Sequence, residues 1–296
     1  SVTDISKSFQ VDTLSIQNFF QPANIGYFIP TYQRKYSWDE GNVDQLMVDV
    51  CYGVSDLLNN PDTSHFLGTL ILIDGQSDDR DLQNLNPKAL PDQIRKIIDG
   101  QQRISTLALL ACQIYKRLHA IKQNLPVGPD YNELVVAVSD WQRSLQNVFS
   151  FDLRRGNPNR KPIIIRGESD SWIESDATIT TYKSEVALYL SQYVSGIMEN
   201  PASPVFPEIP ASEPLGPNLE AMENWLNKVT DAHKSNNEYD FPTAWQIIEK
   251  IPQSKLWSYD RPNIVSVINQ RSTPVSPLTN QLCSIVQLLA FCHYLL

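Results

Sequence analysis

The residues best suited to chemistry lie in the stretch IIDGQQRIST, residues 97–106. Gly100 lets the backbone turn sharply between a predicted buried strand and a predicted helix, and the first amides of that helix have no acceptor within it. Such a helix start attracts anions, and Arg103 in its first turn adds a guanidinium that binds phosphate oxygens in pairs. Asp99 is suited to hold a divalent cation or to order a water beside the same phosphates. Neutral donors are available from Gln101, Gln102, Ser105 and Thr106.

The same spacing has a simpler interpretation. Asp99 can serve only as the N-cap of the helix, with the Arg103 guanidinium paired to its carboxylate. Spacing alone favours neither the phosphate site nor this capped pair.

A second cluster lies at residues 29–38, which read IPTYQRKYSW. Pro30 stiffens the backbone, and the aromatic rings, planar amide and two cations that follow can hold a phosphate-sugar backbone, stack on a base or set an apolar wall beside a cation. The simpler interpretation is a loop that Tyr36 and Trp38 anchor to the core. The candidate binding residues are Pro30, Tyr32, Gln33, Arg34, Lys35 and Trp38.

Hydrophobic periodicity predicts the elements that must position both clusters. Apolar runs predict strands at 27–30, 65–73, 94–98 and 162–165, and apolar spacing of three and four predicts helices at 43–58, 104–118, 131–148, 182–197 and 219–232.

Two segments between these elements are predicted to be irregular. Residues 76–93 are polar and predict an exposed insertion loop, and residues 201–217 hold six prolines and predict an extended connector. We therefore expect an α+β chain of two units, 1–166 and 167–296, the second mainly helical. The apolar pattern continues to the last residue, which predicts that the second unit is truncated and that a longer protein continues beyond Leu296.

Composition excludes several classes of protein. The chain has 296 residues, 42% of them hydrophobic and 19% charged, with a net charge of −9, which is typical of a soluble globular protein. It has no apolar stretch of the roughly 20 residues that a membrane span needs, and its four cysteines show no CxxC spacing, so we expect a reducing cytoplasm. The absence of GxxxxGK[ST], GxGxxG, HExxH and GxSxG motifs disfavours P-loop NTPases, Rossmann enzymes, zincins and α/β-hydrolases.

Positive charge is concentrated at residues 121–166, which hold seven basic and four acidic side chains. If the basic residues share a face they can meet several phosphates, whereas the simpler interpretation is a solvated rim beside a strand. The basic residues that bear on this choice are Arg143, Arg154, Arg155, Arg160, Lys161 and Arg166.

Three motifs together resemble a known family. IPxYQRxYxW at 29–38, HFLGTLIL at 65–72 and IIDGQQRxxTL at 97–107 are similar, in order and approximate spacing, to the N-terminal domain of GmrSD-type modification-dependent restriction proteins. That domain is related to the ParB N-terminal and sulfiredoxin fold. The resemblance therefore implies a ParB/sulfiredoxin-like domain with a small mixed sheet over residues 1–166.

The resemblance also implies a nucleoside triphosphatase built on the DGQQR turn and coupled to recognition of modified double-stranded DNA in bacterial anti-phage defence. It implies Mg²⁺ at Asp99 with GTP or ATP, and a nuclease domain farther along the polypeptide, outside this chain. The implied catalytic residues are Asp99, Gln101, Gln102 and Arg103, and the implied nucleotide-binding residues are Gly100, Arg103, Ser105, Thr106 and Arg34.

Members of this family sense either sugar-bearing bases or phosphorothioate linkages. A sulfur atom in the backbone is larger, softer and more weakly hydrated than oxygen, so its reader needs a small apolar wall beside a cation. Pro30, Tyr32 and Arg34 offer that combination within five residues. A glucosylated base needs a roomy polar pocket, and no single segment predicts one, so the sequence favours phosphorothioate.

Departures from the family pattern support an alternative. Residues near 266–279 resemble the family's FExxNxRGxxLSxxD stretch, but Ser266, Ser272 and Thr279 replace the usual glutamate, glycine and aspartate. The alternative function is a non-catalytic DNA-binding or protein-docking module on the same scaffold.

Overall fold

The computed structural model describes residues 12–22, 24–64, 66–76, 79–85, 87–153, 159–172, 181–231, 241–257, 262–269 and 276–296. Within these ranges the chain is an α+β protein with nine α-helices, a four-stranded mixed sheet and a two-stranded sheet. The elements are α1 (Ile16–Phe20), β1 (Ile25–Ile29), α2 (Glu40–Asn59), β2 (Ile71–Asp74), β3 (Gln93–Asp99), α3 (Gln101–Gln123), α4 (Pro129–Phe149), β4 (Ser150–Asp152), β5 (Arg160–Pro162), β6 (Ile164–Arg166), α5 (Glu185–Glu199), α6 (Leu215–Asp231), α7 (Ala244–Lys250), α8 (Pro262–Asn269) and α9 (Pro277–Leu295).

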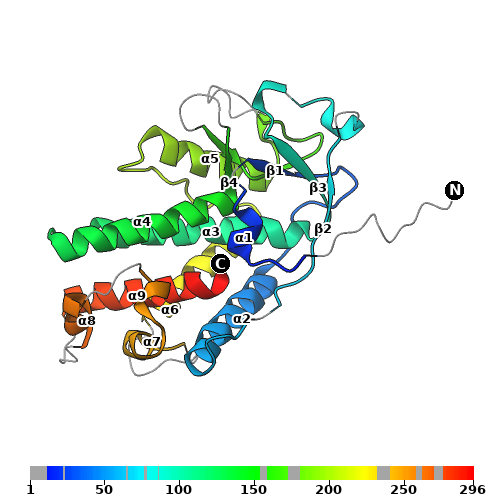
Figure 1. Ribbon diagram of the computed structural model, residues 1–296. Helices are drawn as coiled ribbons and strands as arrows, with labels where there is room; N and C mark the ends of the chain where they lie inside the picture. The colour runs from blue at the N-terminus through cyan, green and yellow to red at the C-terminus, as the bar shows by residue number, and fades with distance from the viewer. Residues whose placement is uncertain are drawn as a thin grey trace.

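The larger sheet has the strand order β2-β3-β1-β6. Strand β1 pairs in parallel with β3 and with β6, whereas β2 is antiparallel to β3. The sheet stands at one end of the molecule, and α3 runs from it between α4 and the layer that holds α6 and α9 (Figure 1). Because β1, β3 and β6 are parallel, their carboxyl ends meet at one edge of the sheet.

The predicted periodicity is confirmed for most of the first half. Helix α2 begins at a capping box between Asp39 and Asn42, and α3 follows β3 after a single glycine. Every residue of β1 is buried, and Gly26 in this strand lies under the Trp172 ring, where a Cβ atom would stand 2.6 Å from Cη2. The strand therefore depends on a glycine where the ring covers it.

Three predicted elements differ from the structure. The predicted strand at 65–73 is shortened to β2, because residues 66–70 leave the sheet and Leu70 packs over Gly100. The predicted strand at 162–165 is two strands in two sheets, β5 and β6, with Ile163 between them. The prediction of a loop at 76–93 is wrong in part, since it holds two short 3₁₀ helices, Arg80–Leu82 and Pro87–Ala89. Lys96 of β3 ties the first of them to the sheet through Asp79 and Asp81, at 2.8 and 2.9 Å.

The proline-rich segment is also more ordered than predicted. Helix α6 begins at Leu215, inside the range 201–217, because a proline in the first turn of a helix costs no hydrogen bond. Phe206 is held against the helices by the rings of Tyr193 and His119, with centroid distances of 5.0 and 5.9 Å. The segment is therefore packed on α3 and α5, and one continuous core joins residues on both sides of position 166. The division into folding units at that position stays a prediction.

The four cysteines are free thiols inside this core. Burial raises the pKa of Cys51 to about 12 and that of Cys283 to about 11. The thiolate form is disfavoured at these positions, so both side chains act as small apolar groups. None of the described helices is long and apolar enough to cross a membrane.

We expect the stability of the fold to fall as the pH drops from 7.5 to 5.5, and His119 to contribute to this loss. Burial, and then the nearby Lys122 charge, hold the pKa of His119 below its ordinary 6.5. The unfolded chain therefore takes up a proton before the folded chain does, so stability is fully present above pH 6.5 and is lost as the pH falls.

Unfolding in denaturant at pH 7.5 and 5.5 measures this effect. His119→Gln should show a smaller loss than the wild type, with the remainder due in part to His293, whose pKa burial also lowers. An equal loss in both proteins would remove His119 from the explanation.

Candidate functional site

The two candidate clusters meet at the carboxyl edge of the sheet. Strands β1 and β3 are parallel neighbours, with Phe28 opposite Lys96 in their register. The loop 30–39 leaves β1 at this edge, and Asp99 and Gly100 leave β3 beside it. Segments more than 60 residues apart in the sequence therefore form one site, as the strand order requires.

The turn at the start of α3 depends on Gly100. This residue has a φ of +100° in the left-handed region, is the N-cap of α3, and offers no side-chain hydrogen bond to the first amides. A Cβ atom there would stand 2.3 Å from Cδ2 of Leu70. The backbone can pass from β3 into the helix at this point only because the residue is glycine.

The structure does not show the capped pair of Asp99 and Arg103. The helix is capped by Gly100 rather than by Asp99, and no ion pair joins the Asp99 carboxylate to the Arg103 guanidinium. Asp99 is exposed and its carboxylate has no partner among the described residues. The simpler interpretation of this motif is therefore absent from the fold.

Arg103 is held in place without an ion pair. Its guanidinium carbon lies 5.7 Å from the centre of the Trp38 ring, a cation–π contact. On another side it reaches Gly68, where a Cβ atom would stand 1.5 Å from Nη1. None of the described carboxylates pairs with this guanidinium, so its charge is available to an anionic ligand.

The two glutamines of the motif hold the neighbouring loop. The Gln101 amide donates to the carbonyl of Arg34 at 2.7 Å. Gln102 donates to the Lys35 carbonyl at 3.1 Å, and its Oε1 accepts from the amides of Ser37 and Trp38 at 2.8 and 3.2 Å. Both side chains are buried, and each gives an amide N–H to a carbonyl of the loop, so they position the loop.

The hydroxyls of Ser105 and Thr106 are buried as well, with 2% and 0% of each residue exposed. The Thr106 hydroxyl donates to the Gln102 carbonyl at 2.8 Å, within its own helix. In this conformation neither hydroxyl can reach a ligand at the sheet edge, so their predicted contact with a nucleotide has no support from the geometry.

The loop turns its carbonyl groups toward the sheet. Gln33 donates through its side chain to the Ile98 carbonyl at 2.7 Å, and Arg166 at the end of β6 donates to the carbonyls of Gln33 and Arg34, the latter at 2.9 Å. The side chains of Tyr32, Arg34 and Lys35 are exposed, and those of Arg34 and Lys35 have no partner among the described residues. The outer surface of the loop is therefore basic and aromatic.

The predicted apolar wall beside a cation is only partly present on this surface. Pro30 is buried at the end of β1, whereas Tyr32 is 71% exposed on the loop. Trp38 is half-buried and covered on one face by Arg103. Tyr32 with Arg34 and Lys35 is thus the part of the predicted group that an approaching molecule can touch.

The described basic residues of the stretch 121–166 do not share one set of contacts. Arg143 pairs with Asp140 on α4, and Arg160 donates to Asn147 and Ser150. Of the described residues of this stretch, Arg166 is the one that donates to the loop of the candidate site. Arg154 and Arg155 lie outside the described residues.

Sequence reasoning did not assign two residues of this site. Arg166 was only one member of a basic stretch, and the signal that could have found it is its position after a strand that pairs with β1. Gly68 lies inside the HFLGTLIL motif, where a glycine in an apolar run is itself a signal for close approach.

A metal ion would find one carboxylate ligand at this site, that of Asp99. No cluster of three acidic, histidine or cysteine side chains that could hold a metal occurs among the described residues. Mg²⁺ usually keeps several waters and binds through one or two carboxylates together with substrate phosphates. Asp99 fits that mode, and it does not fit a closed protein cage.

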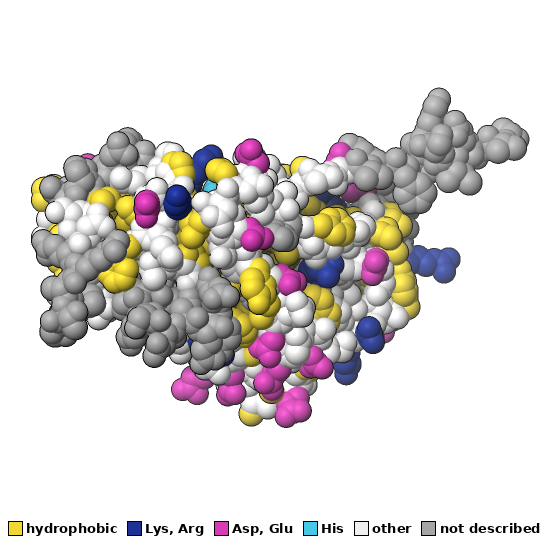
Figure 2. All heavy atoms as spheres, turned by 90° about the horizontal axis from the view of Figure 1, so that it is seen from below, with side chains coloured by type: hydrophobic (Ala, Val, Ile, Leu, Met, Phe, Trp, Pro, Cys, Tyr) yellow, Lys and Arg dark blue, Asp and Glu magenta, His cyan; other side chains and the backbone are white. Residues whose placement is uncertain are grey.

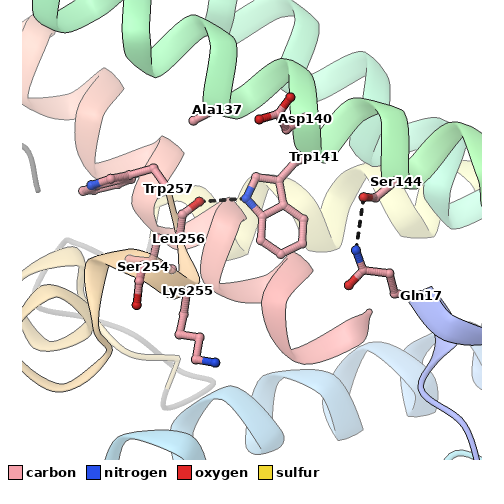
Figure 3. A pocket seen from close by; sticks show the side chains of 9 residues that line it. All are labelled: Gln17, Ala137, Asp140, Trp141, Ser144, Ser254, Lys255, Leu256 and Trp257. Carbon is pink, nitrogen blue, oxygen red and sulfur yellow. Dashed lines mark hydrogen bonds between the residues drawn. The ribbon is translucent and has the colours of Figure 1, made fainter. Parts of the chain in front are cut away.

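The hollow shown in Figure 3 lies elsewhere in the molecule, between α1, α4 and the turn at 253–257. Its volume is about 180 Å³, small beside the several hundred Å³ of typical ligand pockets. Trp141 on its wall donates to the Leu256 carbonyl at 2.7 Å, and Gln17 donates to Ser144 at 3.4 Å. It shares no residue with the candidate site.

Acidic side chains gather along the lower edge of the face that Figure 2 shows, over α2. The exposed acidic residues of this helix are Glu40, Asp44, Asp49 and Asp56. The negative charge of this helix repels a polyanion.

The sequence of the chain matches a protein-family model. The family model described as GmrSD restriction endonuclease, N-terminal domain, matches residues 16–278. The matched range includes both clusters, the 65–72 motif and α6. Among curated proteins, no match to the chain is found.

Proposed function

Because the chain belongs to the family of GmrSD restriction endonuclease N-terminal domains, we propose that it binds and hydrolyses nucleoside triphosphates at the carboxyl edge of its sheet and couples hydrolysis to recognition of modified DNA. The observation that carries the proposal is that Arg103 is held in place and has no ion-pair partner among the described carboxylates. Its guanidinium is fixed on Trp38 and against Gly68 at a glycine turn, and no described carboxylate neutralises it. A fixed cation at a helix start is suited to a polyphosphate.

Each polar residue has a role in this proposal that follows from its contacts. Arg103 and the first amides of α3 neutralise charge on the phosphates, while Gln101 and Gln102 keep the loop 30–38 in place through its carbonyls. Gln101 and Gln102, which the resemblance implies to be catalytic, have this positioning role in the proposal, since each amide donates to a carbonyl of the loop. Asp99 would hold Mg²⁺, which supplies a second positive charge to the phosphates when bound.

Hydrolysis of ATP and of GTP by the purified chain, with and without modified DNA, tests the proposal. The alternative function, a module without turnover, predicts that nucleotide binds and is not hydrolysed. The departures at 266–279, of which Ser272 lies outside the described residues, are the feature that favours this alternative. Ser276 caps α9 and accepts from the amide of Thr279 at 3.1 Å, so this part of the altered stretch has a structural role.

DNA recognition is proposed for the outer surface of the loop. Tyr32, Arg34 and Lys35 present an exposed ring beside two cations, which suits a phosphorothioate linkage better than a glucosylated base. Binding of sulfur-modified, glucosylated and plain duplexes should rank the sulfur-modified duplex first. Equal affinity for all three would end the sensor proposal.

Arg34→Ala is expected to weaken binding to every duplex and to reduce the slope of log K against log salt by about 1, because one phosphate contact is lost. Titrations over a range of salt concentrations measure the slope. Arg80→Ala, an exposed arginine on another segment, is the control and should leave the slope unchanged. A slope equal to that of the wild type in Arg34→Ala would place DNA elsewhere.

A further inference from the structure

A buried side chain of the helical region reaches into the candidate site. Asn218 in the first turns of α6 is fully buried, with 0% of the residue exposed. Its amide nitrogen donates to the Trp38 carbonyl at 2.7 Å and to the Tyr36 hydroxyl at 3.0 Å. The partners lie 180 and 182 residues away in the sequence, so this contact exists only in the folded chain.

The hydrogen bonds beyond Asn218 run in one direction. The Thr106 hydroxyl gives its proton to the Gln102 carbonyl, and its oxygen lies 2.9 Å from the Tyr36 hydroxyl. Because Thr106 has no second proton, Tyr36 donates to Thr106 and accepts from Asn218. The order of donation is therefore Asn218 to Tyr36 to Thr106 to the first turn of α3.

Asn218 takes part in this arrangement as a donor. Its Oδ1 accepts no hydrogen bond from the described residues, although the atom is buried. A buried acceptor without a partner costs about 1–3 kcal/mol. The two N–H donors are the part of the side chain that the site uses, and an aspartate of the same shape would lack them.

Trp38 is consequently fixed on both sides of its backbone. Its amide is held by Gln102 at 3.2 Å and its carbonyl by Asn218 at 2.7 Å. The indole ring so placed carries the guanidinium of Arg103. A displacement of α6 would release the Trp38 carbonyl and, with it, the support of Arg103.

We infer that Asn218 is a positioning residue of the nucleotide site, which holds Trp38 beneath Arg103 and makes turnover depend on the placement of α6. This inference rests on the proposed hydrolysis at that site. It assigns a part of the site to the region after residue 166, where the sequence predicted only a helix. The Asn218 amide contacts Tyr36 and Trp38. Asn218 therefore acts on Arg103 through Trp38 and is not expected to touch the ligand itself.

Steady-state hydrolysis by the full chain tests the inference with three variants. Asn218→Ala should lower kcat about 10-fold and change KM less than about 2-fold, because a misplaced cation loses transition-state stabilisation before it loses binding. Tyr36→Phe should lower kcat about 3-fold, and the double variant should be no slower than Asn218→Ala, since both remove members of one chain of hydrogen bonds.

Trp225→Phe is the matched control. Trp225 lies on the same helix, and its indole nitrogen donates to Asp44 of α2 at 2.7 Å. This variant should lose thermal stability to a similar extent and keep the wild-type kcat. A general weakening of α6 would instead lower kcat in both variants.

The outcomes separate the inference from the proposed function. Wild-type kcat in Asn218→Ala, an equal loss in Trp225→Phe, or independent effects of Asn218→Ala and Tyr36→Phe would overturn the inference and leave hydrolysis in place. Hydrolysis that is absent from the wild type would overturn both. If Asn218→Ala does not fold, Tyr36→Phe decides. It removes the hydroxyl that accepts from the Asn218 amide and helps to orient it toward Trp38, so an unchanged kcat would contradict the inference.

Discussion

Replacing Arg103 by alanine is expected to lower triphosphate hydrolysis at least about 100-fold with little change in thermal stability. The guanidinium makes no ion pair with a described carboxylate and its stacking on Trp38 is worth only about 0.5–1 kcal/mol at a partly exposed site, so the fold loses little. The phosphates would lose the one fixed cation that the glycine turn presents to them. Phosphate release from ATP and GTP measures the effect.

A second variant at Arg103 decides whether its charge or its geometry matters, and a variant at Arg117 serves as the control. Arg103→Lys keeps the charge and loses the planar fork, so it should retain part of the activity. Arg117→Ala removes an arginine from the same helix, 14 residues and about 21 Å farther along, and should hydrolyse like the wild type. Wild-type rates in Arg103→Ala would disprove the proposed site.

The elements of the first half were predictable because each has one buried stripe. The spacing of Val43, Met47, Val50 and Val54 predicts α2, and the glycine between β3 and α3 predicts the turn that the structure shows. Local pattern suffices there because the same residues decide both the element and its buried face.

The roles of the polar residues were not predictable in the same way. The sequence shows that Gln101 and Gln102 are donors at a helix start, but it does not show that the carbonyls of residues 34 and 35 lie within reach. The apolar run at 65–73 has the composition of a strand, but the strand begins only at Ile71, and the side chain of Leu70 covers Gly100. Both facts depend on the neighbouring loop, which no local window contains.

The position of Asn218 carries no local signal at all. A single asparagine after Gly216 and Pro217 is typical of the start of any helix. Its side chain becomes part of the site because α6 packs on α2 and α3, which brings it to Tyr36 and Trp38. Contacts of this range follow from the packing of whole helices, so only the folded chain shows them.

Gly68→Ala is expected to reduce hydrolysis about 10- to 100-fold while the chain remains folded. Gly68 has a φ of +135°, and an added Cβ would stand 1.5 Å from Nη1 of Arg103. The obstructed atom is the end of a flexible side chain, so the guanidinium would swing off the Trp38 ring, and the positive φ would add backbone strain. The variant therefore displaces the Arg103 guanidinium and leaves its charge unchanged.

Gly128→Ala separates this displacement from backbone strain. Gly128 also has a positive φ, +159°, but the nearest atom to an added Cβ is Cδ2 of Tyr131 at 3.6 Å, an ordinary contact. This control should share part of the loss of stability and none of the loss of hydrolysis. In the Arg103→Ala background Gly68→Ala should have no further effect, because the side chain that it displaces is gone. A further decrease in that background would show that Gly68 acts on something other than Arg103.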